Sequence, residues 1–167
     1  MLLAQPAVPG EQAERILRLH GRGFSFEVVE PPGWLLDTRS APQVANFIFY
    51  PEGGEWRGSD RVIFARFVPR RPEESTGEFL RTDRENFGKQ CPLGNDGQAV
   101  SPGEAVSGFS LQRFDCPPSK PELVAVRSVP GFFVVFVLVA PEDDVPARKA
   151  FDAILRSFKW REGEVGE

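Results

Sequence analysis

The nine-residue run at positions 132–140 (FFVVFVLVA) constrains the fold of this chain more than any other segment. It is too short to cross a membrane, because a spanning helix needs about 20 apolar residues. Its length suits a buried β-strand, and its side chains are apolar at odd and even positions alike. Alternate side chains of a strand point to opposite faces of a sheet. The run therefore predicts a central strand whose two faces are both covered.

The C-terminal segment has the clearest helical pattern in the chain. Six apolar residues recur at a spacing that places them on one stripe of a helix. They are Ala147, Ala150, Phe151, Ile154, Leu155 and Phe158. Asp143 and Asp144 provide the N-cap, and Pro146 suits a first helical turn. We expect this amphipathic C-terminal helix to pack on the sheet.

The remaining elements are short and joined by turns. Strands are expected over residues 24–29, 44–50, 61–68, 98–106, 108–114 and 123–129. A capping box at Ser75 and Glu78 begins a second helix that ends at Gly88, and residues 11–20 show helical spacing as well. Short turns favour antiparallel neighbours. The expected fold class is α+β, with a single antiparallel β-sheet sandwiched by helices (α/β/α).

A length of 167 residues suits one domain, which is expected over residues 22–160. Residues 1–21 are expected to be an N-terminal tail with a short helix, and residues 161–167 a loose acidic tail. Residues 1–7 (MLLAQPA) resemble the end of an export signal, although they lack a basic segment. Two interpretations stay open: the remnant of a leader, or a plain N-terminal tail.

The chain has two cysteines, Cys91 and Cys116, and each is followed by proline. They are not spaced as a CxxC pair, and a single histidine does not complete a Cys/His metal site. Both cysteines lie where loops are expected rather than on apolar faces. We therefore expect a disulfide between them, with two free thiols as the alternative.

Two parts of the sequence resemble PsbP-like domains. Residues 23–34 (GFSFEVVEPPGW) resemble an opening strand of the form "ysf.yP.gW". Residues 131–138 (GFFVVFVL) and 151–158 (FDAILRSF) resemble a core strand followed by a helix ending "f..il.SF". The resemblance covers about residues 22–160, and the chain is similar to a bacterial member of the superfamily, of periplasmic or lipoprotein type.

The resemblance implies a binding or assembly protein rather than an enzyme. The superfamily includes extrinsic subunits of photosystem II, a Ran-binding nuclear import factor, and bacterial periplasmic or lipoprotein members. It implies an antiparallel sheet sandwiched by helices and supplies no catalytic residue. A metal-binding histidine pair has no counterpart, because His20 is the only histidine. A periplasmic or secreted location is expected ahead of a cytoplasmic one.

Composition and motifs indicate no reaction chemistry. A net charge of −4 with scattered basic residues argues against nucleic acid or anionic membranes as partners. The sequence has no nucleophile elbow, phosphate loop or calcium loop. His20 is expected to be a cation at a helix end. We expect no enzymatic activity, no metal, no cofactor and no membrane span. Asp83, on the apolar stripe of its helix, is expected to pair with an arginine or to cap a loop.

Four residues near turns are candidates for contact with a protein partner: Trp34, Tyr50, Trp56 and Arg66. Exposed Trp, Tyr and Arg side chains are typical anchors of protein interfaces. Trp34 has a second interpretation as a core residue beneath its Pro-Gly-Trp turn. The expected function is that of a non-enzymatic binding or accessory protein, a monomer or weak homo-oligomer that presents a sheet-and-loop surface. The alternative is a carrier of a small apolar ligand in a Phe-lined cavity.

Overall fold

The computed structural model describes residues 14–39, 46–91 and 98–161, with the side chains of residues 98–104 left aside. The tails expected at residues 1–13 and 162–167 lie outside the described residues. Ordered structure nevertheless passes both expected domain boundaries. A strand begins at Ile16, before residue 22, and the last strand includes Arg161.

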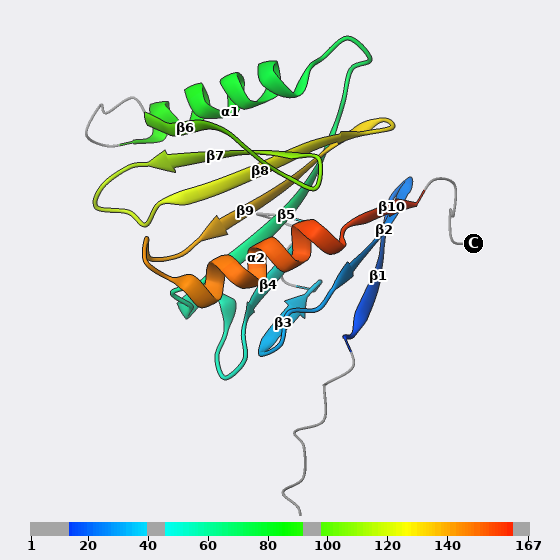
Figure 1. Cartoon of the computed structure of the whole chain (residues 1–167), viewed down its shortest axis with the longest axis vertical. Helices are drawn as coiled ribbons and strands as arrows, with labels where there is room; N and C mark the ends of the chain where they lie inside the picture. The colour runs from blue at the N-terminus through cyan, green and yellow to red at the C-terminus, as the bar shows by residue number, and fades with distance from the viewer. Residues whose placement is uncertain (1–13, 40–45, 92–97, 162–167) are drawn as a thin grey trace, which may run out of the picture.

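Seven antiparallel strands form the main sheet (Figure 1). Their spatial order is β3 (Trp34–Asp37), β4 (Phe47–Pro51), β5 (Val62–Pro69), β9 (Phe132–Val139), β8 (Glu122–Val129), β7 (Phe109–Asp115) and β6 (Gln98–Val106). The apolar run forms β9, which pairs with β5 on one side and with β8 on the other. Its six middle residues are buried. The prediction of a central strand covered on both faces is confirmed.

One face of this sheet, called the inner face below, packs against α2 (Val145–Ser157). The side chain of Asp144 accepts a hydrogen bond of 3.0 Å from the backbone N–H of Ala147, as an N-cap does. Five apolar residues on one stripe of α2 are buried, as the periodicity predicts. Figure 1 shows α2 lying across this face, with α1 at the opposite side of the main sheet.

A second, three-stranded sheet lies on the inner side in the order β1 (Ile16–Gly21), β2 (Phe24–Val29) and β10 (Lys159–Arg161). The expected single sheet is therefore wrong, and so is the expected helix as far as residues 16–20 are concerned. Leu17 and Leu19 also fit a period of two, and both face the core, while Arg18 between them pairs with Glu27. Because the segment pairs with β2, it forms a strand with a period of two and not a helix. His20 is exposed on this strand rather than at a helix end.

Aromatic rings fill the space between the two sheets. Phe26 of β2 is fully buried, and its ring lies within 4.9–6.4 Å of the ring centroids of Phe24, Phe47, Phe67 and Phe158. Such pairs stabilise a core by dispersion and by edge-to-face contacts. These phenylalanine rings therefore pack on each other as core residues.

A charged group holds the small sheet on its other side. Glu27, in the middle strand β2, accepts hydrogen bonds of 3.0 Å from Arg161 and 2.7 Å from Arg18. The bonds from Arg161 and Arg18 hold the pKa of Glu27 below its usual range. This carboxylate therefore joins the first and last described strands of the chain through the strand between them.

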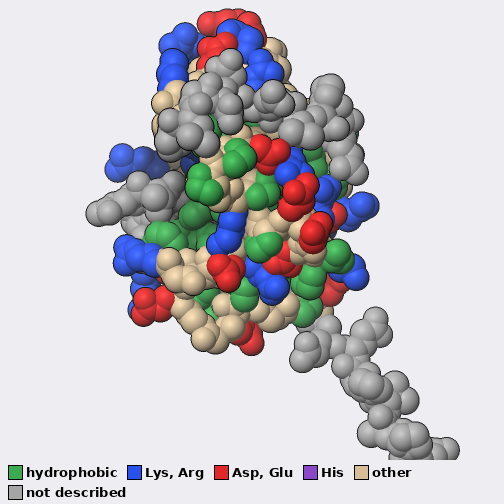
Figure 2. All heavy atoms as spheres, turned by 90° about the vertical axis from the view of Figure 1, so that its left-hand side faces the viewer, with side chains coloured by type: hydrophobic (Ala, Val, Ile, Leu, Met, Phe, Trp, Pro, Cys, Tyr) green, Lys and Arg blue, Asp and Glu red, His purple; other side chains and the backbone are tan. Residues whose placement is uncertain are grey.

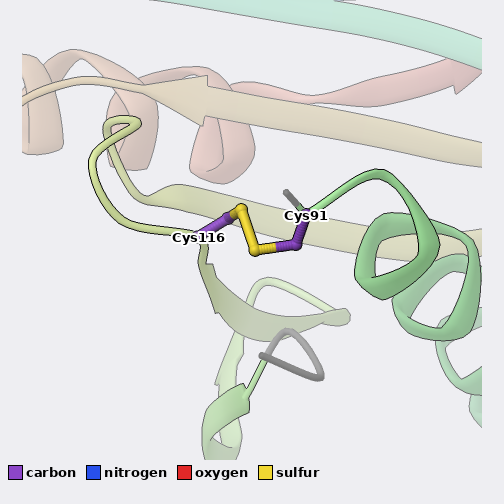
Figure 3. The surroundings of a disulfide bond; sticks show 2 residues. All are labelled: Cys91 and Cys116. Atoms are coloured by element: carbon purple, nitrogen blue, oxygen red, sulfur yellow. A yellow bond between two sulfur atoms is a disulfide. The ribbon is translucent and has the colours of Figure 1, made fainter. Parts of the chain in front are cut away.

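The opposite, outer face of the main sheet packs against α1 (Thr76–Gln90). The expected capping box is present: Ser75 accepts a hydrogen bond from the backbone N–H of Glu78, and the Glu78 side chain accepts one from that of Ser75. At the other end of α1, Cys91 is bonded to Cys116, which follows β7 (Figure 3). The predicted disulfide is confirmed, and it ties the C-terminal end of α1 to the sheet.

Candidate functional site

Three of the four candidate contact residues lie on the outer face, with Tyr50 and Arg66 on opposite sides of the Ile48–Phe64 pair. Ile48 of β4 pairs with Phe64 of β5, so Tyr50 and Arg66, two residues further along, point to the same side. Trp56 reaches this side from the 3-10 helix η1 (Trp56–Gly58), which follows β4. Trp34 does not join them. It lies in the main core with 7% of its surface exposed, as its second interpretation states.

The aromatic part of this surface, called the outer cluster, is only partly buried. It consists of Ile48, Tyr50, Trp56, Val62 and Phe64. The Trp56 ring stands edge-on to the Phe64 ring at a centroid distance of 6.4 Å, and the Arg57 guanidinium lies 4.9 Å from the Trp56 centroid. Tyr50, Trp56 and Phe64 all keep part of their surface accessible. Partly exposed aromatic rings beside an arginine form a surface that can receive a protein.

A groove of about 830 Å³ lies next to the outer cluster, between α1 and the sheet. Its walls come from β5 and β9 on one side and from the C-terminal half of α1 on the other. Thirteen residues line it: Phe64, Arg66, Asp83, Asn86, Phe87, Lys89, Gln90, Cys91, Cys116, Ser119, Lys120, Glu122 and Val137. Both cysteines are among them, so the disulfide forms part of its wall. We call this feature the α1 groove.

Asp83 of α1 and Arg66 of β5 join the helix to the sheet across this groove. The Arg66 Nη2 atom lies 3.5 Å from the Asp83 Oδ1 atom. The expectation that Asp83 pairs with an arginine is confirmed. Both side chains keep part of their surface accessible, 39% for Arg66 and 22% for Asp83. The pair therefore lies in the wall of the groove, within reach of a bound molecule.

Glu122, at the start of β8, is a groove residue that the sequence reasoning missed. Its strand alternation places it with Val124 and Val126 on the outer face. Burial raises the pKa of Glu122 above its usual range; Arg66 opposes this effect and Asp83 adds to it. The sequence could have indicated this position through the alternation of β8, because Glu122 stands two residues before Val124 at the edge of an apolar strand.

The surface around these residues carries charges of both signs. Lys120 forms an ion pair of 2.8 Å with Asp60, and Lys89 is exposed on α1. Figure 2, which views the side on the left of Figure 1, shows hydrophobic side chains interleaved with acidic and basic ones. In the part of the chain that the structure describes, no three His, Cys, Asp or Glu side chains gather as a metal site. A mixed surface of this kind suits a protein partner.

Comparison with protein-family models finds no match, and comparison with characterised protein sequences finds none either. Solved structures do match. Cyanobacterial PsbP (CyanoP) from Synechocystis sp. PCC 6803 is similar over 93% of this chain and 98% of its own, with a TM-score of 0.57 and 14% identity. The chain has a PsbP-like fold. LpqN, involved in cell envelope biogenesis of Mycobacterium tuberculosis, is similar over 90% of this chain and 92% of its own, with a TM-score of 0.50 and 15% identity.

The PsbP-like fold confirms the resemblance drawn from residues 23–34, 131–138 and 151–158. At 14–15% identity the similarity concerns the fold alone. Across the described residues, no helix of this PsbP-like chain is long and apolar enough to cross a membrane.

Proposed function

We propose that this PsbP-like protein is a non-enzymatic accessory protein that binds a protein partner through the outer cluster and the adjoining α1 groove. One observation carries the proposal: α1 lies against β7 and β8, while Tyr50, Trp56 and Phe64 on β4, η1 and β5 stay partly exposed. Partly exposed Tyr and Trp rings with an arginine beside them are the side chains that contribute most to binding at protein interfaces.

The location we propose is the cell envelope or the space outside it. The Cys91–Cys116 disulfide supports this, because disulfides persist in oxidising compartments. LpqN, a structural neighbour, is involved in cell envelope biogenesis, and a similar setting for this chain agrees with the disulfide. An accessory role also agrees with what the superfamily resemblance implies.

The alternative of an apolar-ligand carrier finds no support in the described residues. A carrier needs an enclosed, mainly apolar cavity of about 300 Å³ or more. The interior phenylalanines pack directly on one another instead, as Phe24 and Phe67 do at 4.2 Å between ring centroids. The α1 groove is at the surface, and its lining includes five charged residues: Arg66, Asp83, Lys89, Lys120 and Glu122.

Site-specific photo-crosslinking in the native host tests the proposal. p-Benzoylphenylalanine replaces Tyr50 in one variant and Arg156, an exposed residue on α2, in a matched control. We expect a discrete adduct with one protein from position 50, its loss when Trp56→Ala is added, and no such adduct from position 156. Equal adducts from both positions, or none from position 50, would contradict the proposal.

A further inference from the structure

Among the described residues, the charges in the α1 groove are not all paired. Arg66 is paired with Asp83 at 3.5 Å, and Lys120 is paired with Asp60 at 2.8 Å. Glu122 has neither a hydrogen bond nor an ion pair with any described residue. It is also half-buried, and this burial is the main cause of its raised pKa. A carboxylate that is desolvated and unpaired costs free energy, and a cation placed beside it would recover that cost.

The walls near Glu122 suit a cation carried on an apolar stem. Phe64 and Val137 on the sheet and Phe87 on α1 line the same groove. Lysine and arginine side chains bury their methylene stems on apolar surface while the charged end reaches a polar group. Aromatic rings add attraction for such a cation. The net charge of −4 further favours a basic partner by long-range attraction.

We propose that the α1 groove receives a lysine or arginine side chain of a protein partner, with the Glu122 carboxylate as its counter-ion. The inference rests on the proposed function, because the cation belongs to the protein that also contacts the outer cluster. Arg66 does not repel this cation with its full charge, since Asp83 compensates it. Lys120 is likewise compensated by Asp60.

This arrangement makes binding depend on pH. The charged groups that line the groove with Glu122 are Arg66 from β5, Asp83 and Lys89 from α1, and Lys120 from the loop before β8, of which Arg66 and Asp83 act on the Glu122 carboxyl group. Asp83 is the only other carboxyl group among these four, and its ion pair with Arg66 engages it. Glu122 is charged only above its raised pKa, so affinity for a cation increases as pH rises through that value. A bound cation in turn lowers the pKa of Glu122.

The test uses three short peptides and the whole chain, followed by NMR titration of backbone amides and of the Glu122 carboxyl carbon. The probe is Ac-Ala-Phe-Lys-Ala-NH2; norleucine or glutamate replaces lysine in the two comparison peptides. We expect saturable shifts at Phe64, Phe87 and Glu122 with the lysine peptide. Binding should be about tenfold weaker with norleucine, corresponding to the loss of one charge contact. The Glu122 pKa should fall when the lysine peptide is bound.

Two variants separate the charge contact from folding. Glu122→Gln should weaken binding of the lysine peptide about tenfold and leave the affinity for the norleucine peptide unchanged. Glu73→Gln removes the same charge from an exposed position that does not line the groove, and should leave both affinities within about twofold. Amide spectra of both variants report whether the fold is retained.

Each result decides the matter. Equal affinity for the lysine and norleucine peptides, no shift in the groove up to millimolar probe, or tighter binding of the glutamate peptide would overturn the inference. The last result would instead make Arg66 the anchor for an acidic partner. Because crosslinking from position 50 needs no cation, its success alongside a failed titration would leave the proposed function standing without this inference.

Discussion

Removing the disulfide should destabilise the protein by about 3.5 kcal/mol. The double variant Cys91→Ser/Cys116→Ser releases a loop whose ends are 25 residues apart in the sequence. The loop-entropy relation for a closure of that length gives about 3.5 kcal/mol at 25 °C, by restricting the unfolded chain. For a chain of this size, that loss corresponds to a Tm lower by about 10 °C.

Urea unfolding followed by far-UV circular dichroism measures this loss, with and without reductant. The wild-type protein in reductant should coincide with the double variant, and the variant should not respond to reductant. The denaturant slope should increase as well, because the unfolded chain without the crosslink exposes more surface. Hydrogen exchange should accelerate in β9 by the same free energy, because a buried central strand exchanges through global unfolding, and it should accelerate at the C-terminal end of α1 as well.

A loss below about 1 kcal/mol would refute the reasoning, because the loop-entropy relation leaves no room for so small a value. An unchanged denaturant slope together with a large loss would also contradict it. That combination would place the effect in the folded state, at the junction of α1 with the sheet, rather than in the unfolded chain.

Three further predictions concern the core and the small sheet. Phe26→Ala should cost about 3–5 kcal/mol in chemical unfolding, whereas Leu35→Ala at an edge that is 37% exposed should cost less than about 1 kcal/mol. Gly21→Ala should lower the Tm, because a Cβ atom there would lie 2.0 Å from the Phe24 ring, and Gly54→Ala, where no atom lies within 4 Å of the added Cβ, is its control for crowding. Glu27→Gln should remove stability at pH 7; in the wild type this contribution, present above the unfolded-state pKa, is lost as pH falls through the lowered folded-state pKa.

The central strand and the last helix were predictable because each has a long and unambiguous pattern. The run at residues 132–139 is apolar at every position, and the stripe on α2 extends over more than two turns. The strand at residues 16–21 was not predictable, because a segment of six residues with Ile16, Leu17 and Leu19 fits both a helix and a strand. Strand β10 has only three residues, Lys159–Arg161, and owes its conformation to pairing with β2. Two sheets instead of one follow from these two short strands.

The candidate site was predictable in its residue types and less so in its location. Trp56, Tyr50 and Arg66 stand near turns or on a strand with clear alternation, so their exposure could be inferred from local sequence. Trp34 differs because its side chain faces inward. The surroundings of Glu122, which shift its pKa, include residues of β5 and α1 that are distant in sequence. Long-range packing of this kind leaves little signal in a single sequence.

The size of α1 explains why part of the outer face stays exposed. A helix is about 10 Å wide and adjacent strands are about 4.8 Å apart, so one helix covers about two strands. α1 accordingly lies on β7 and β8, whereas the inner face receives both α2 and a three-stranded sheet. In the described part of the chain, η1 covers part of β4 and β5 on the outside and α1 reaches β5 through the Arg66–Asp83 ion pair, which leaves Tyr50 and Phe64 partly exposed. Because apolar side chains left at a sheet surface gain free energy when a second protein covers them, the asymmetry of the two faces itself favours association on the outer one.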